Sequence, residues 1–296
     1  MIKNISVIFM SIFFESLPFL LLGSLISAII ETYISNEKLS KMIPKNKILG
    51  SIVGVLLGFF LPACDCAVIP VSKRLLKKKV PINVAISFML ASPIINPVVL
   101  LSTYYAFYKT EPKIFWFRLI FGILISLIIG IIMGLIFNKQ DVVANDLDDD
   151  CECDHCHHDH KESNKFKEII NHTSKDLFEV VKFLMFGALI ASLVQVLLPR
   201  SILLAFNNNQ ILSIITLMIF AYLISLCSTS DSFVGKSLLS TFSTSSIIAY
   251  LLLGPMIDIK NTIVLFGNYK KKFVVTLISL IFIVIFITSV LVVNVL

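Results

Sequence analysis

The chain contains apolar runs that are long enough to cross a lipid bilayer as helices. A spanning helix needs about 20 consecutive, mostly apolar residues, and runs of this kind occupy 5–33, 81–107, 115–137, 177–198 and 273–296. Of all residues, 57% are hydrophobic and only 15% are charged, whereas soluble domains average about 25% charged residues. Because helices satisfy their own backbone hydrogen bonds in lipid, we expect an all-α integral membrane protein with about eight membrane segments.

The polar landmarks of the chain recur at a spacing of about 163 residues, which indicates an internal repeat. Three pairs carry the pattern: Glu15-x3-Phe19-x3-Gly23 with Glu179-x3-Phe183-x3-Gly187, Cys64 with Cys227, and Ser92-Pro93-x2-Asn96 with Gly254-Pro255-x2-Asp258. We therefore predict a first membrane repeat at 1–138, a linker at 139–172 and a second membrane repeat at 173–296.

The charged loops indicate how the two repeats are oriented. Loops 38–47 and 73–79 are both basic, and the positive-inside rule places both in the cytoplasm. Region 48–72 would then enter and leave on one side as a re-entrant hairpin, which leaves an odd number of full crossings and inverts the second repeat. Lys109, Lys113 and Arg118 would lie outside, which counts against this topology. The alternative is eight ordinary spans in two parallel halves.

The best candidate for a substrate site is Cys64-Asp65-Cys66. A carboxylate at membrane depth costs roughly 2.5–3.5 kcal/mol on insertion scales, so it usually has a function. Residues two apart point to nearly opposite faces of a helix but to the same side in extended backbone. Pro62 and Pro70 favour a break in the helix here. We therefore predict an unwound segment that presents both sulfurs together; the alternative is that the cysteines merely pack as small apolar residues.

Other polar groups within the apolar segments are weaker candidates. Cys227 and Asp231 lie in a hydroxyl-rich stretch that corresponds, in the second repeat, to Cys64-Asp65-Cys66. Asn96 and Asp258 lie at matched proline-containing helix breaks. Cys227, Asp231 and Asn96 are predicted to line the substrate site. Lys236 is a possible counter-charge for Asp231. Two acidic residues in matched apolar runs are predicted to couple transport to protons or another ion: Glu15 and Glu179. Both could instead simply meet water near an interface.

The predicted linker contains the chain's densest group of metal-binding residue types. Thiolate and imidazole are the preferred ligands of zinc, and thiolate also suits copper(I). The spacing does not fit a zinc finger, so a flexible acceptor or sensor on the cytoplasmic side is expected. The predicted ligands are Cys151, Cys153, His155, Cys156, His157, His158 and His160.

The sequence also argues against some classes of function. No phosphate-binding glycine motif is present, and every histidine lies in the linker, so neither ATP hydrolysis nor a Ser-His-Asp arrangement is expected and the chain is not predicted to be an enzyme. Its basic residues lie in short loops, where they set topology, so nucleic acid is not an expected partner.

Two motifs carry a resemblance to a known family. The segment Leu61-Pro62-Ala63-Cys64-Asp65-Cys66-Ala67-Val68-Ile69-Pro70, followed by Ser92-Pro93-Ile94-Ile95-Asn96-Pro97, resembles the bacterial predicted-permease family that includes organoarsenical exporters and predicted copper/zinc exporters. Members often have glycine where this chain has Ala67. The resemblance implies a multi-pass permease of the bacterial inner membrane in which Cys64 and Cys66 engage the substrate.

Taken together, these features predict a permease that exports a thiophilic transition-metal ion, zinc or copper, by secondary transport. No permanent cofactor is expected, and zinc or copper is the expected bound ion. The alternatives are export of a trivalent organoarsenical or another sulfur-reactive small molecule, or a role as a membrane metal sensor or partner subunit. Expected partners are the metal or metalloid substrate, the lipid bilayer, and either a second copy of the chain or a second membrane subunit.

Overall fold

The structure is a computed structural model that describes residues 2–33, 44, 46–61, 65–78, 80–138, 142, 165–197 and 209–295. These residues form twelve helices, and no β-strand occurs among them. Five helical stretches in the described part are long and apolar enough to cross a membrane: Ile82–Phe107, Lys113–Ile136, Val180–Leu197, Thr244–Asn268 and Lys271–Val293. The predicted all-α membrane fold is confirmed.

The helices form two series with matching order and length. The first series is α1 (Ile2–Tyr33), α3 (Lys47–Phe60), α4 (Asp65–Lys77), α5 (Ile82–Ile95), α6 (Pro97–Phe107) and α7 (Lys113–Ile136). The second series is α8 (Lys165–Leu197), α10 (Gln210–Ile224), α11 (Ser230–Leu238), α12 (Thr244–Met256), α13 (Ile259–Asn268) and α14 (Lys271–Val295). The boundaries predicted for the linker and the two repeats stay a prediction, and α8 already begins inside the predicted linker.

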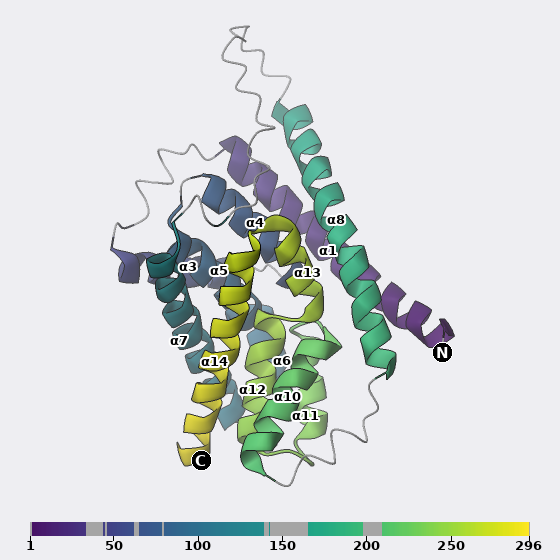
Figure 1. Ribbon diagram of the computed structural model, residues 1–296, viewed down its shortest axis with the longest axis vertical. Helices are drawn as coiled ribbons and strands as arrows, with labels where there is room; N and C mark the ends of the chain where they lie inside the picture. The colour runs from purple at the N-terminus through teal and green to yellow at the C-terminus, as the bar shows by residue number, and fades with distance from the viewer. Residues whose placement is uncertain are drawn as a thin grey trace, which may run out of the picture.

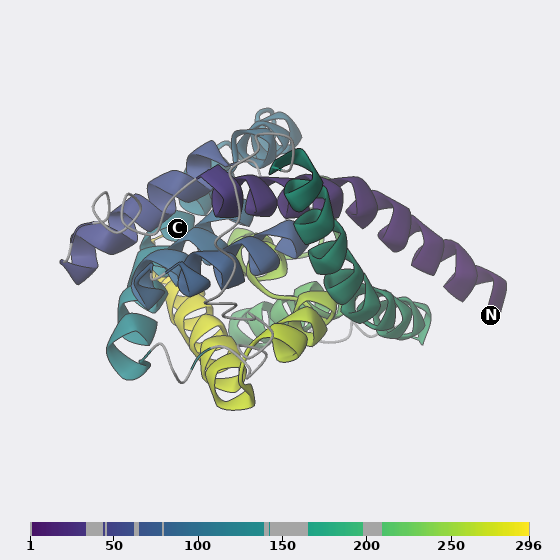
Figure 2. The same cartoon turned by 90° about the horizontal axis from the view of Figure 1, so that it is seen from above.

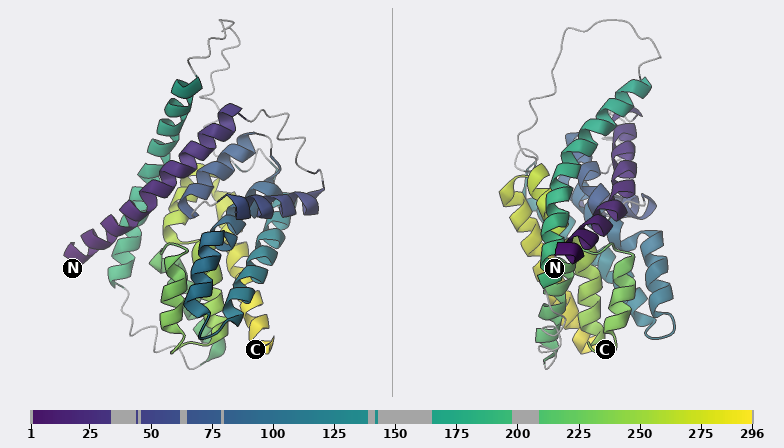
Figure 3. Two further views of the ribbon diagram at one scale, coloured as in Figure 1. Left: turned by 180° about the vertical axis from the view of Figure 1, so that it is seen from behind. Right: turned by 90° about the vertical axis from the view of Figure 1, so that its right-hand side faces the viewer.

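Several corresponding helices of the two series run in opposite directions. In Figure 1, α6 lies below α5, whereas α13 lies above α12. The N-terminal end of α1 lies low while α8 begins at the top, and these two helices pack against each other along one flank (Figures 2 and 3). Two further corresponding pairs, α5 with α12 and α7 with α14, also contact each other.

Two broken helices form the centre of the molecule. The helix over 82–107 breaks at Asn96, and the helix over 244–268 breaks at Ile257 and Asp258. In their apolar windows, 83% and 89% of residues are buried, against 33% and 28% in α7 and α14. The outer helices α7 and α14 therefore present apolar side chains to lipid, while the broken helices are enclosed by protein. Irregular backbone at membrane depth requires such enclosure.

Neither α3 nor α4 is long enough to span a bilayer alone, since they have 14 and 13 residues against the roughly 20 that a span needs. The same is true of α10 and α11, with 15 and 9 residues. These helix pairs have the lengths of a hairpin that enters and leaves on one side. Their position relative to a bilayer stays a prediction.

Close packing of α3 and α7 on the two sides of α5 depends on glycine. Gly50, Gly54 and Gly58 form a stripe at four-residue spacing on α3, and each faces α5. A β-carbon at Gly54 would collide with the backbone carbonyl of Val84. Small residues at such positions let membrane helices approach closely.

The Gly54→Ala variant is expected to lower the free energy of unfolding by about 1–3 kcal/mol, the usual range for overpacking, because the obstructing atom belongs to the α5 backbone and cannot rotate away. Thermal unfolding of the detergent-solubilised protein would measure this loss. Gly235→Ala is the matched control, since its β-carbon would meet the Leu251 side chain at 3.2 Å. Equal melting temperatures for the two variants would contradict the expectation.

Candidate functional site

Among the residues that the structure describes, six charged side chains are buried inside this apolar bundle: Asp65, Lys73, Arg118, Asp231, Asp258 and Lys260. Burying an ionised group is expensive unless it is paired or hydrogen-bonded, so each of these residues needs a partner. Lys73 finds one at the α13 end, where its Nζ donates a 3.0 Å hydrogen bond to Asn268 Oδ1. The other five form two neighbouring clusters.

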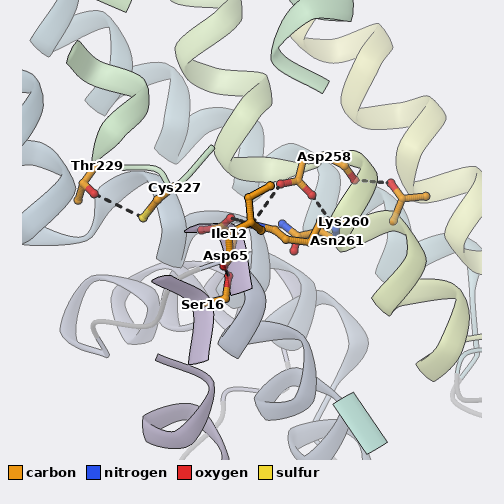
Figure 4. Close-up of polar contacts among 9 residues, drawn as sticks. Ile12, Ser16, Asp65, Cys227, Thr229, Asp258, Lys260 and Asn261 are labelled. Atoms are coloured by element: carbon orange, nitrogen blue, oxygen red, sulfur yellow. Dashed lines mark hydrogen bonds and ion pairs between the residues drawn. The ribbon is translucent and has the colours of Figure 1, made fainter. Parts of the chain in front are cut away.

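The first cluster consists of Asp65, Lys260 and Asp258 (Figure 4). Lys260 Nζ lies 3.7 Å from Asp65 Oδ2 and 3.6 Å from Asp258 Oδ2, and all three side chains are at most 4% exposed. Asp65 comes from the first repeat and the other two from the second. The cluster therefore joins the two halves of the chain through one shared ammonium group.

Local helix chemistry positions both carboxylates. Asp65 is the first residue of α4, and a negative charge is favoured at a helix N-terminus. Asp258 is the N-cap of α13 and accepts a 2.6 Å hydrogen bond from Asn261 N. Asparagine and aspartate are preferred caps, and Asn96 is the corresponding cap of α6, accepting a 3.0 Å bond from Val98 N. The two helix breaks thus carry matched capping residues.

Tight packing holds Lys260 in place. Gly187 of α8 faces α13 so closely that a β-carbon would lie 3.1 Å from both Cα and the carbonyl oxygen of Lys260. This glycine belongs to the Glu-Phe-Gly pattern shared by α1 and α8. The phenyl ring of the same pattern, Phe183, packs on Gly267 further along α13. The repeated pattern in α8 therefore serves to dock α8 onto α13.

The second cluster surrounds Arg118, which lies in α7 with no exposed surface. Arg118 Nη1 donates to Thr103 Oγ1 at 2.7 Å and to Ser232 Oγ at 2.8 Å, and Nη2 donates to the Ser228 carbonyl at 3.3 Å. The prediction that Arg118 belongs to a loop is therefore wrong, because it lies inside α7. A loop residue would be solvated, whereas this guanidinium binds α6 and α11 together.

Asp231 lies beside Arg118 and completes the second cluster. Its Oδ1 accepts a 3.0 Å hydrogen bond from Tyr250 OH, and Arg118 lies within electrostatic range. Gly254 provides the space, since a β-carbon there would lie 2.8 Å from Asp231 Oδ2. Lys236, predicted as a possible counter-charge, is exposed, so Arg118 fills that role inside the bundle.

The two clusters interact, and Cys227 lies near them. Asp231 is within electrostatic range of both Asp65 and Asp258, and Cys227 is within range of Asp65 and Glu15. Cys227 lies in the non-helical stretch between α10 and α11, where its Sγ contacts Thr229 Oγ1 at 3.4 Å. The structure thus brings a thiol of the second repeat toward Asp65 of the first.

That stretch begins with an unusual backbone. Ser225 ends α10 with φ 51°, the one positive φ at a non-glycine residue in the described part of the chain. Its buried hydroxyl has no hydrogen-bond partner among the described residues. Strained backbone of this kind clusters at functional sites, and here it starts the segment that carries Cys227.

The structure describes only some of the other predicted site residues. Glu15 lies on α1 with an exposed side chain. Cys66 lies in α4, which begins at Asp65 and continues through Pro70, so the prediction of an unwound segment is wrong from Asp65 onward. The side chains of Cys66 and of Glu179, which lies in α8, are outside the description, and Cys64 falls outside the described residues altogether. So do all seven predicted linker ligands: Cys151, Cys153, His155, Cys156, His157, His158 and His160. Within the described ranges, no group of three or more His, Cys, Asp or Glu side chains is placed to hold a metal ion.

Three residues of the site were missed by the sequence analysis: Lys260, Arg118 and Tyr250. Lys260 carried a detectable signal, because it lies two residues after Asp258 within an apolar segment, where a charge is rarely tolerated. Arg118 follows two other basic residues and therefore resembled part of a loop. Tyr250 carried no signal, since aromatic residues are common in apolar helices.

Comparison with known proteins decides the family. Residues 1–294 match the family ArsP_1, described as "Predicted permease". The chain belongs to this family of predicted permeases. It is 36% identical over 271 residues to a Streptococcus mutans protein named "Putative two-component membrane permease complex subunit", covering 90% of this chain and 87% of the relative. It is 39% identical over 288 residues to UPF0718 protein YcgR of Bacillus subtilis, covering 96% and 95%. No solved structure matches.

Membership of the predicted-permease family confirms two expectations. The resemblance found in the Cys64 and Asn96 motifs is correct, and it extends over nearly the whole chain. The apolar helices and the family together make the chain a multi-pass membrane permease, which in a bacterium resides in the inner membrane.

Proposed function

We propose that this permease exports a thiophilic transition-metal ion, zinc or copper, by secondary transport through the centre of the bundle. The observation that carries the proposal is the approach of Cys227 toward Asp65 within a buried, charge-rich centre. Asp65 stands between Cys64 and Cys66 in the sequence. Carboxylate and thiolate are zinc ligands, and thiolate suits copper(I). Cys64, Asp65 and Cys66 would hold the ion, with Cys227 and Asp231 opposite.

The opposed helix directions support alternating access by two inverted repeats. In such transporters, broken helices meet near the membrane midplane, and one repeat rocks against the other around a fixed site. We propose that the broken helices α5–α6 and α12–α13, which are enclosed by protein, meet near the midplane, and Asn96 would line the path at the first break. Glu15 and Glu179 are proposed to exchange protons during the cycle, and the linker cysteines and histidines to capture the ion on the cytoplasmic side.

The Cys64→Ser/Cys66→Ser double variant tests the proposal. Zinc and copper(I) flux in proteoliposomes should be abolished, because the hydroxyl group is a poor ligand for both ions, while membrane abundance should not change. Deleting residues 146–160 should only impair transport, since the linker is proposed to deliver the ion rather than to conduct it. Wild-type flux in the double variant would refute the site.

A second candidate substrate is a trivalent organoarsenical. Two thiolates are enough to bind such a molecule, and Cys64 and Cys66 would supply them. Including the arsenical in the same flux assay separates the two substrates. If only the arsenical is transported, and the linker deletion does not change its flux, the substrate would be the arsenical and not a metal ion.

The Streptococcus mutans relative also suggests a partner. That protein is named as a subunit of a two-component membrane permease complex, and we propose by analogy that this chain works with a second membrane subunit. Co-purification of a second membrane protein with the tagged chain from its own membranes would support the assembly. Full flux by the purified chain alone would argue against an obligatory partner.

A further inference from the structure

Lys260 is shared between two carboxylates of different repeats. Its Nζ lies at nearly equal distances from Asp65 Oδ2, 3.7 Å, and from Asp258 Oδ2, 3.6 Å. Figure 4 shows the lysine side chain reaching between the two acids. Two carboxylates and one ammonium leave the cluster with one excess negative charge, so the group has the electrostatics of a cation-binding site.

The surroundings of the ammonium contain more oxygen acceptors than are used. Asp65 Oδ2 and Asp258 Oδ2 are engaged by the ammonium at 3.7 and 3.6 Å, whereas the buried Asn261 Oδ1 has no hydrogen-bond partner within the described part of the chain. Asn261 is itself only 2% exposed and lies beside the pair in Figure 4. Buried polar atoms in native proteins are nearly always satisfied, so unsatisfied ones call for an explanation. Two carboxylates that share one ammonium, with an unpaired amide oxygen nearby, are an arrangement that can accept a second cation.

Lys260 sits where a helix disfavours it. It is the second residue of α13, two residues after the cap Asp258, and the N-terminal end of a helix carries partial positive charge. The corresponding position after the cap Asn96 is Val98, so the fold itself does not require a lysine there. The helix dipole opposes the ammonium, and the carboxylates hold it, which makes it a cation that can be displaced.

We propose that Lys260 is a tethered competitor for the substrate cation: it occupies Asp65 when no substrate is bound, and the arriving cation takes Asp65 while the ammonium withdraws to Asp258. This inference rests on the proposed function and concerns the same site. Because Asp258 already shares the ammonium, Lys260 remains paired throughout the exchange. The competition lowers substrate affinity and promotes release, since the returning ammonium replaces the departing ion.

The charge-balanced variant Lys260→Gln/Asp258→Asn tests this competition. It removes one positive and one negative charge together and leaves Asp65 without its competitor. Zinc affinity of the detergent-purified protein, measured by competition with a chelating dye, should increase at least tenfold, and zinc release after dilution should slow correspondingly. Lys260→Arg keeps the positive charge and should bind zinc with nearly wild-type affinity. Thermal unfolding of each variant reports whether it is folded.

The outcomes separate this inference from the function on which it rests. Tighter zinc binding in the double variant supports the competition. Unchanged or weaker zinc binding by the double variant overturns the role of Lys260. The proposed function still stands in that case if zinc binding by the wild-type protein depends on Cys64 and Cys66. Absence of both zinc and copper(I) binding by the wild-type protein overturns both. If the double variant does not fold, the single variant Lys260→Gln takes its place. It too should bind zinc more tightly, and unchanged or weaker zinc binding would again overturn the role of Lys260.

Discussion

Replacing Arg118 by methionine is expected to lower the free energy of unfolding by about 3–5 kcal/mol, the usual loss when one of two interacting buried charges is removed. The substitution takes away the charge beside Asp231 and the donors to Thr103, Ser232 and the Ser228 carbonyl. Methionine fills much of the same volume, so a cavity contributes little. Thermal unfolding in detergent, read by tryptophan fluorescence or circular dichroism, would measure the loss.

A second variant measures how much of this loss of stability comes from the interaction between the charges of Arg118 and Asp231. Arg118→Met/Asp231→Asn removes both charges and should recover a substantial part of the stability, because neither partner is then left buried and unpaired. Lys113→Met provides the control on the same helix, since Lys113 is exposed at the start of α7. If Arg118→Met melts at the temperature of Lys113→Met, the arginine does not hold the bundle together.

Replacing Asp65 by asparagine is expected to weaken substrate binding by about 2 kcal/mol or more, which is about 30-fold in affinity. The substitution removes the charge between Cys64 and Cys66 but leaves Lys260 paired with Asp258 at 3.6 Å. The protein should therefore remain folded while flux falls. Flux in proteoliposomes across a range of zinc concentrations, together with the melting temperature, distinguishes lost binding from lost folding.

The appropriate comparison for Asp65→Asn is Glu15→Gln. Both variants remove one acidic charge from the membrane region, but Glu15 is exposed and lies outside the buried clusters. Under the proposed coupling role, Glu15→Gln should leave zinc affinity unchanged and alter only the dependence of flux on a proton gradient. If Asp65→Asn binds zinc with wild-type affinity, the Asp65 carboxylate is not part of the substrate site.

Local sequence chemistry was sufficient for the helical class and the places where the central helices break. Long apolar runs must be helical in lipid, because only there are the backbone groups satisfied within the segment. Asn96 and Asp258 could be recognised as break residues because proline lies nearby and because both side chains cap helices. These features depend on neighbouring residues only, so one sequence is enough to predict them.

The composition of the buried site was decided by tertiary structure. The pairing of Lys260 with Asp65, and of Arg118 with Ser232, joins residues from different halves of the chain, and no local pattern records which distant side chain an isolated charge will meet. The sequence placed Arg118 in a basic loop, whereas helix packing enclosed it. A buried charge must find its partner wherever the fold brings one, so the two halves had to be assembled before the site could be identified.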